Sequence, residues 1–123
     1  MAKIFLDTNY FIDIIEQRKT IEIEQFRSHS LYLSPLSIHI YVYLYKLKIP
    51  NGKLEKLLDY FTVIPIDEKI TINSLEGPTI DFEDNLQLHS AAVSECDYFL
   101  TSDKSLLTSR FFGKVQILKN LQA

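Results

Sequence analysis

Three aspartates stand where a fold could bring them together around a metal ion. Asp7 ends a first apolar run, Asp84 lies in an acidic segment ahead of a late helix-like stretch, and Asp103 follows a later apolar run. Mg²⁺ and Mn²⁺ prefer oxygen ligands and are commonly held by a few carboxylates. Such an ion can activate a bound water and neutralise charge on a phosphoryl group. The sequence therefore predicts metal-assisted chemistry on phosphates.

Polar neighbours of these acids fit the same chemistry. Asn9, Thr101 and Ser102 are placed to supply hydrogen bonds that orient a carboxylate or a water molecule. Taken alone, any one of the three aspartates is more often a helix cap than a ligand. Their occurrence together, each beside an apolar strand or at the start of a helix, favours a shared site.

Strand and helix signals alternate along the chain, which predicts the elements that must position these acids. Alternating strands and helices indicate a parallel sheet covered on both faces, an α/β fold. Asn9 is expected to cap the first helix. We expect strands at residues 3–6, 31–33, 62–66, 98–100 and 115–118, and helices at 9–18, 21–28, 34–48, 53–60, 67–75 and 82–95.

Length and composition fit one small domain spanning residues 1–123. The net charge of −3 predicts no general attraction to nucleic acid, although a bound cation would offset part of it. Cys96 is the only cysteine, which excludes an intrachain disulfide and a cysteine-based zinc site. We expect a cytoplasmic protein without a membrane partner, because no signal peptide is recognisable and the longest apolar stretch is too short to cross a bilayer.

Three segments together resemble the PIN-domain family: residues 6–9 (LDTN), 81–84 (DFED) and 96–103 (CDYFLTSD). The resemblance spans nearly the whole chain and is closest to the small VapC-like ribonuclease toxins. It implies a three-layer α/β/α sandwich around a parallel sheet of about five strands. It also implies an Mg²⁺- or Mn²⁺-dependent endoribonuclease acting on RNA, a partner antitoxin protein and a homodimer. Asp7, Asp84 and Asp103 would be the catalytic, metal-binding acids, with Thr101 or Ser102 as the associated hydroxyl.

One departure from the family pattern concerns the helix predicted after the second strand. The family usually places a glutamate there, and alignment on Ser34 and Ser37 puts Ile40 in its position. Four carboxylates would balance two divalent cations, whereas three fall one charge short. Our hypothesis is that the chain retains one metal position, binds a second ion poorly and has weakened activity.

Two other functions remain open at this stage. A catalytically inactive PIN-like module that binds RNA or protein is favoured by Ile40. An aspartate phosphotransferase or receiver-like domain also collects acids at strand ends. It would normally carry a second acid close after Asp7, where Thr8 and Asn9 stand instead.

Overall fold

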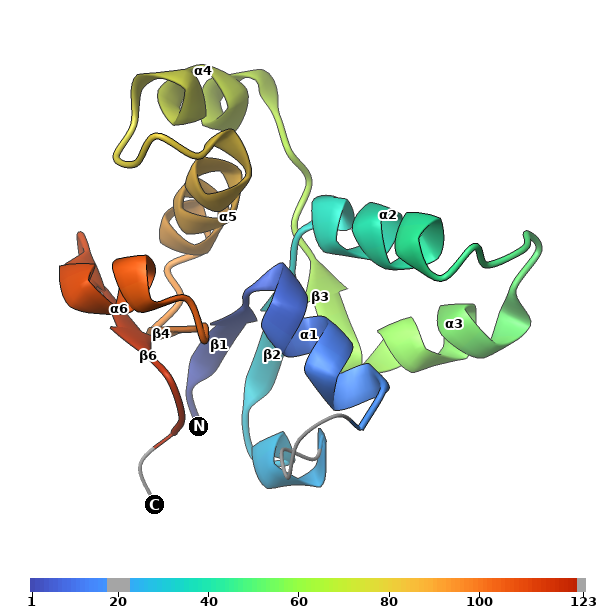
Figure 1. The fold of residues 1–123 in the computed structure, drawn as a ribbon. Helices are drawn as coiled ribbons and strands as arrows, with labels where there is room; N and C mark the ends of the chain where they lie inside the picture. The colour runs from blue at the N-terminus through green and yellow to red at the C-terminus, as the bar shows by residue number, and fades with distance from the viewer. Residues whose placement is uncertain (18–22, 122–123) are drawn as a thin grey trace.

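A six-stranded sheet with the strand order β3-β2-β1-β4-β6-β5 forms the centre of the protein (Figure 1). The computed structural model describes residues 1–17 and 23–121. All neighbouring strands pair in parallel except β5 and β6, which are antiparallel. The strands are β1 (Lys3–Leu6), β2 (Ser30–Leu33), β3 (Phe61–Val63), β4 (Tyr98–Leu100), β5 (Phe111–Phe112) and β6 (Val115–Leu118).

Short polar side chains begin the described α-helices by accepting a hydrogen bond from a backbone N–H of the first turn. The capping residues are Asp7, Ser34, Asn51, Asp67, Asp81 and Asp103. In the described part of the chain no helix is both long enough and apolar enough to cross a membrane. The helices are α1 (Thr8–Ile15), α2 (Pro35–Leu44), α3 (Gly52–Leu57), α4 (Glu68–Glu76), α5 (Phe82–Val93) and α6 (Lys104–Ser109), with 3-10 turns η1 (Ile23–Phe26) and η2 (Leu58–Tyr60).

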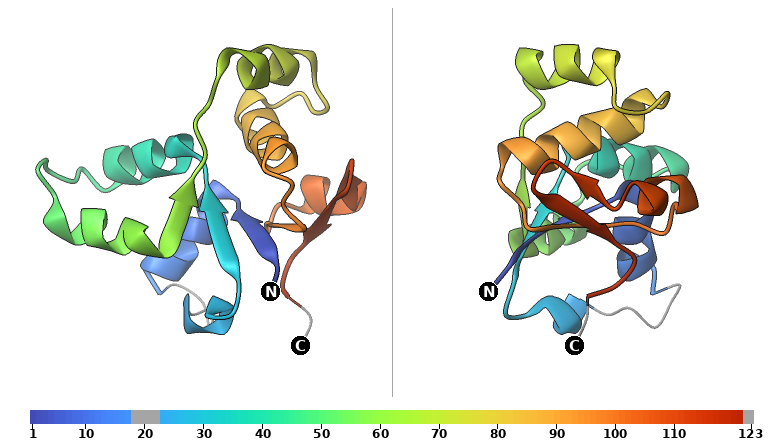
Figure 2. Two further views of the ribbon diagram at one scale, coloured as in Figure 1. Left: turned by 180° about the vertical axis from the view of Figure 1, so that it is seen from behind. Right: turned by 90° about the vertical axis from the view of Figure 1, so that its left-hand side faces the viewer.

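Alternating side chains of the strands divide the core into two layers. In β1, Ile4 and Leu6 pack into a cluster with α1, α2 and α3, whereas Phe5 packs into a second cluster with α5 and α6. Because successive side chains of a strand point to opposite faces, the sheet is covered on both sides. The two helical layers stand on either side of the strands in Figure 2. The predicted three-layer α/β/α architecture is therefore confirmed.

Several predicted elements differ from the observed ones. The predicted strand at 62–66 is β3, which begins one residue earlier and ends at Val63. Two elements were missed: the helix α6 and the two-residue strand β5, whose antiparallel pairing makes the sheet mixed. Part of the predicted helix at 21–28 is the 3-10 turn η1. The end of the predicted helix at 9–18 and the start of the one at 21–28 fall on residues 18–22, which lie outside the described residues.

Candidate active site

The central strands β1 and β4 bring two of the predicted acids to one edge of the sheet. These strands pair in parallel with Leu6 opposite Leu100, so the residues that follow them leave the sheet side by side. The backbone N–H of Asp7 donates to the carbonyl of Leu100 at 3.0 Å. In open α/β sheets, this carboxyl edge is where ligands bind. The strands that start at Lys3 and Tyr98 are therefore neighbours, which a site shared by Asp7 and Asp103 requires.

Asp7 is held in a buried position by two short hydrogen bonds. It is only 6% exposed, and its Oδ1 accepts from the backbone N–H of Thr8 at 2.7 Å. Its Oδ2 accepts from the buried hydroxyl of Thr101, also at 2.7 Å. The carboxylate is therefore fixed by both α1 and the segment after β4. Burial nevertheless raises the pKa of Asp7, because desolvation outweighs the donors.

Asn9 does not cap α1, contrary to the prediction. Asp7 is the residue that caps α1, and Asn9 lies exposed in the first turn of that helix. Position relative to the strand end explains the difference: the chain enters helical geometry at Thr8, directly after Asp7. Thr8 is buried, and the predicted role of Asn9 in orienting a carboxylate or a water molecule stays a prediction.

Thr101 links Asp7 to Asp103. Its Oγ1 donates to Asp7 and accepts from the backbone N–H of Asp103 at 3.0 Å. The Oδ1 of Asp103 caps α6 by accepting from the backbone N–H and the hydroxyl of Ser105, at 2.8 and 2.6 Å. These hydrogen bonds lower the pKa of Asp103 and keep it ionised. Ser102, between them in sequence, is half-buried.

Helix α5 supplies the third predicted acid. Asp81 caps this helix by accepting from the backbone N–H of Asp84 at 2.9 Å. Partial burial, followed by repulsion from Asp81, Asp7, Asp103 and Glu83, raises the pKa of Asp84 to about 7. Burial and repulsion from Asp7 and Asp81 also raise the pKa of Glu83. The start of α5 therefore lies within electrostatic range of Asp7 and Asp103.

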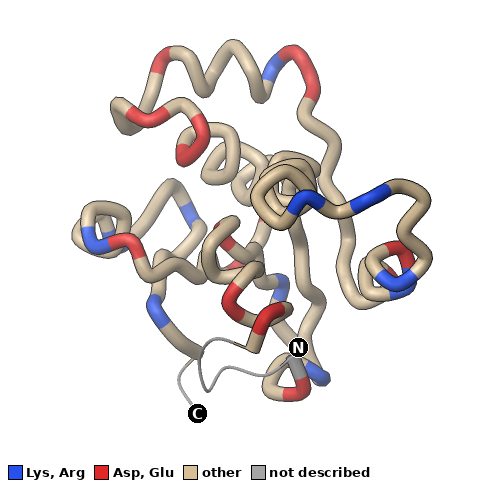
Figure 3. Tube along the Cα trace, turned by 45° about the vertical axis from the view of Figure 1, so that its right-hand side comes forward, with Lys and Arg blue, Asp and Glu red and all other residues tan. Residues whose placement is uncertain are grey.

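The chemistry of these donors fits a hard cation. The described groups that shift the pKa of Asp7, Asp84 and Asp103 are acids and hydrogen-bond donors, with no lysine or arginine among them. Among the described residues, lysines and arginines are scattered along the trace in Figure 3. A divalent cation would relieve this uncompensated negative charge. Among residues 1–17 and 23–121, however, no three His, Cys, Asp or Glu side chains are grouped closely enough to hold an ion.

Sequence reasoning missed a buried polar network beneath Asp7. The Thr8 hydroxyl lies 2.8 Å from the Ser37 hydroxyl of α2. The Thr8 backbone N–H also donates to Oε1 of Gln87 in α5, at 3.0 Å. Gln87 follows Asp84 by three positions and so lies on the same side of the helix. That spacing was the available signal for Gln87.

Ile40, predicted to stand where the family usually has a glutamate, lies in α2 one turn after Ser37. It is partly buried and packs against the core cluster that contains α1. Its hydrocarbon side chain can neither bind a cation nor hydrogen-bond a metal-bound water. The consequence for metal binding stays a prediction.

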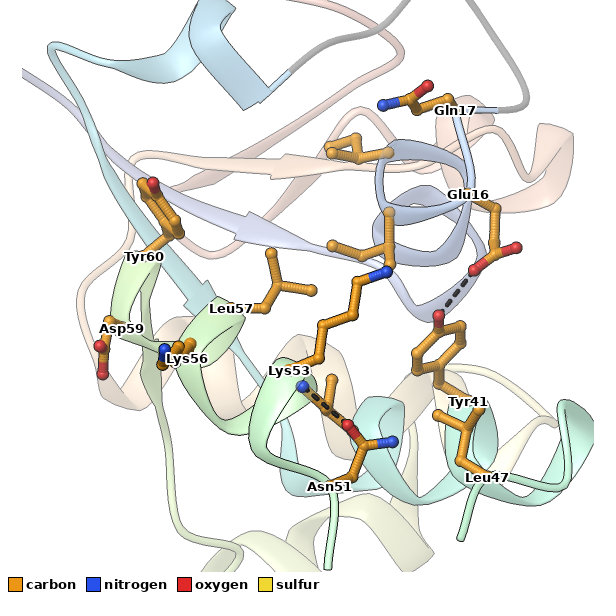
Figure 4. Close-up of a pocket in the computed structure, with 13 residues that line it drawn as sticks. Glu16, Gln17, Tyr41, Leu47, Asn51, Lys53, Lys56, Leu57, Asp59 and Tyr60 are labelled. Atoms are coloured by element: carbon orange, nitrogen blue, oxygen red, sulfur yellow. Dashed lines mark hydrogen bonds between the residues drawn. The ribbon is translucent and has the colours of Figure 1, made fainter.

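A separate groove lies at the C-terminal end of α1 (Figure 4). It has a volume of about 630 Å³, and none of the three predicted acids lines it. At its wall the Tyr41 hydroxyl donates to Glu16 at 2.6 Å. Burial, together with this carboxylate, raises the pKa of Tyr41 to about 12. The groove is lined by the end of α1 with parts of α2, α3 and η2, namely Ile14, Ile15, Glu16, Gln17, Tyr41, Leu47, Asn51, Lys53, Leu54, Lys56, Leu57, Asp59 and Tyr60.

Comparison with solved structures finds the same fold in bacterial proteins of low sequence identity. VapBC2 from Rickettsia felis, bound to a DNA fragment from its promoter, aligns with a TM-score of 0.68 at 15% identity, over 94% of this chain and 97% of that chain. DNA-bound VapBC from Salmonella typhimurium aligns with a TM-score of 0.64 at 16% identity, over 96% of this chain and 98% of that chain. FitAcB from Neisseria gonorrhoeae aligns with a TM-score of 0.62 at 18% identity, over 94% of this chain and 96% of that chain.

Family-level comparison covers most of the chain. No curated protein matches the sequence. The PIN domain family does match, over residues 4–109, a range that contains most of β1, all of β4 and all three predicted acids. The chain therefore belongs to the PIN domain family.

Proposed function

We propose that the protein is a metal-dependent endoribonuclease that hydrolyses RNA phosphodiester bonds. The observation that carries this proposal is the mutual repulsion of Asp7, Asp84 and Asp103, three acids that lie far apart in sequence. Membership of the PIN domain family supports the same reaction class. Mg²⁺ or Mn²⁺ would supply activation of water and neutralisation of phosphoryl charge.

The residues of the site have distinct roles under this proposal. Asp7, Asp84 and Asp103 would hold the cation. Thr101 fixes the rotamer of Asp7 through its 2.7 Å hydrogen bond. Because the pKa of Asp84 is raised to about 7, this carboxyl group exchanges its proton near neutral pH and would lose it when a cation binds. With Ile40 in place of a fourth acid, we expect one well-held ion and weak activity.

Removing the charge of Asp7 tests the proposal. Asp7→Asn keeps an oxygen that can cap α1, so the variant should fold. We expect it to lose Mn²⁺ binding measured by calorimetry and cleavage of a fluorescent single-stranded RNA. Glu55→Gln removes an exposed acid from α3 and is the matched control, which should behave as wild type. Equal cleavage by wild type and folded Asp7→Asn would refute the proposal.

A non-catalytic binding module is the second candidate function. Two observations favour it: the described acids are not grouped around an ion position, and the groove beside α1 offers a docking surface without them. Mn²⁺ separates the two candidates. A nuclease requires the ion for cleavage, whereas a binding module retains RNA or protein in the presence of EDTA.

We also propose protein partners. The solved matches named VapBC and FitAcB suggest that this chain likewise forms part of a toxin–antitoxin pair. A homodimer is supported by apolar side chains exposed on α4 and at the start of α5, including Ile72, Leu75 and Phe82. Large apolar side chains exposed on two helices in contact can mark a protein interface.

A further inference from the structure

Gln87 is a fully buried glutamine, and only the oxygen of its side-chain amide forms hydrogen bonds with the described residues. Its Oε1 lies 3.0 Å from the backbone nitrogen of Thr8 and 3.3 Å from the Thr8 hydroxyl. A backbone N–H can only donate, so the atom facing Thr8 must be the amide oxygen. The amide nitrogen is then on the opposite branch, and Nε2 makes no hydrogen bond with the described residues. Buried donors of this kind are rare in folded proteins and call for an explanation.

The bonded branch of this amide, through Oε1, lies beside Asp7. One backbone N–H, that of Thr8, donates both to Oδ1 of Asp7 and to Oε1 of Gln87, which places the two side chains next to each other. Gln87 therefore binds the same backbone group that fixes one oxygen of Asp7.

We propose that Gln87 is a positioning residue that sets the separation between Asp7 and Asp84. Gln87 and Asp84 are three residues apart in α5 and share one side of that helix. By bonding Thr8, Gln87 ties this side of α5 to the corner at which β1 becomes α1. The inference rests on the proposed metal-dependent activity. Since Gln87 is wholly buried, it acts through Asp7 and Thr8 and does not touch substrate.

The Tm of a Gln87 variant distinguishes the two roles of this residue. Replacement of a purely structural glutamine lowers the Tm, whereas replacement of a positioning glutamine does not. Thr8 N–H keeps its 2.7 Å hydrogen bond to Asp7 when Gln87 is replaced. Gln87→Met has a similar length and removes the unpaired buried donor, whose presence is unfavourable. We therefore expect the Tm of Gln87→Met to equal or exceed that of wild type. Loss of a residue that orients a metal ligand typically lowers metal affinity or activity 10–100-fold. We therefore expect the Mn²⁺ affinity of Gln87→Met to fall by about tenfold or more.

The experiment measures Mn²⁺ binding by calorimetry and Tm by circular dichroism on the full chain, with kcat and KM for RNA as a further readout. Ser90→Ala is the matched control, because Ser90 is equally buried in α5 and donates only to the Leu86 carbonyl within the helix. It should leave Mn²⁺ affinity unchanged. We expect Gln87→Met to lower kcat with little change in KM.

The measured Mn²⁺ affinity and Tm of Gln87→Met distinguish a positioning role of Gln87 from a structural one. Unchanged Mn²⁺ affinity in Gln87→Met overturns the inference while leaving the proposed function intact. A lower Tm overturns it as well, since the amide would then be a structural bond. A wild-type protein that binds no Mn²⁺ would instead overturn the proposed function, and this inference with it.

Discussion

Neutralising Asp84 should make the metal-free protein more stable at neutral pH. The pKa of Asp84 is raised from 3.8 to about 7, first by burial and then by the surrounding acids. Between these two values the folded state binds more protons than the unfolded state, so the free energy of unfolding falls as pH rises. The penalty is absent below about pH 4, which is near the unfolded pKa, and complete above the folded pKa near 7. Asp84→Asn removes it.

The size of the effect follows from the same two pKa values. Taken at full value, they correspond to about 4 kcal/mol of destabilisation at neutral pH. Asp84 is partly exposed, and solvent screening of such charges reduces the figure to roughly 1–2 kcal/mol. For a domain of this size, that is roughly 4–8 °C in Tm. Asparagine retains the backbone hydrogen bond from residue 84 to Asp81, so the cap of α5 is undisturbed.

Thermal unfolding in EDTA at pH 4 and at pH 8 measures this difference. Asp84→Asn should exceed wild type in Tm at pH 8 and match it at pH 4. Glu55→Gln, which removes an exposed acid from α3, should match wild type at both values. The reasoning is refuted if Asp84→Asn is no more stable than wild type at pH 8, or if its advantage is equally large at pH 4.

Three further changes probe the site and the surface. Thr101→Val removes a buried hydroxyl that donates to Asp7 and accepts from Asp103, and should cost about 1–3 kcal/mol in urea unfolding, whereas Thr101→Ser should retain most of the stability. Ile40→Glu should tighten Mn²⁺ binding and raise the cleavage rate; a folded variant that changes neither would disprove our account of Ile40. Leu75→Glu places a charge on the exposed apolar side of α4, where Leu75 is 71% exposed, and should shift a dimer toward monomer in light scattering. An unchanged mass would exclude α4 from the interface.

The parts of the site that follow strand ends could be predicted from the sequence. Residues 3–6 and 98–100 read as short buried strands, and the observed β1 and β4 match them. Parallel pairing then places Asp7 and the segment from Thr101 to Asp103 at the same edge. The prediction succeeded because the strand ends fix where the backbone leaves the sheet, whichever side chain follows.

Features that depend on exact backbone angles or on tertiary contact could not be predicted in this way. Asp7, with extended φ and ψ, caps α1 in place of Asn9, and only the observed strand end decides between them. Strand β5 has two residues, too few for a periodic pattern, and forms through pairing with β6. Gln87 gains its significance from contact with Thr8, 79 residues away in sequence.

Capping and metal binding are compatible roles for these acids. Asp7 and Asp103 cap α1 and α6, while Asp81 caps α5 and thereby fixes the backbone that carries Asp84. The caps hold carboxylates that repel one another, and the pKa of Asp84 is raised first by burial and then by this repulsion. Asparagine is as good a cap as aspartate but carries no charge. Asparagine variants therefore remove the proposed chemistry and keep the scaffold, whereas alanine at Asp7 or Asp103 would remove both and could not distinguish a lost site from a lost helix start.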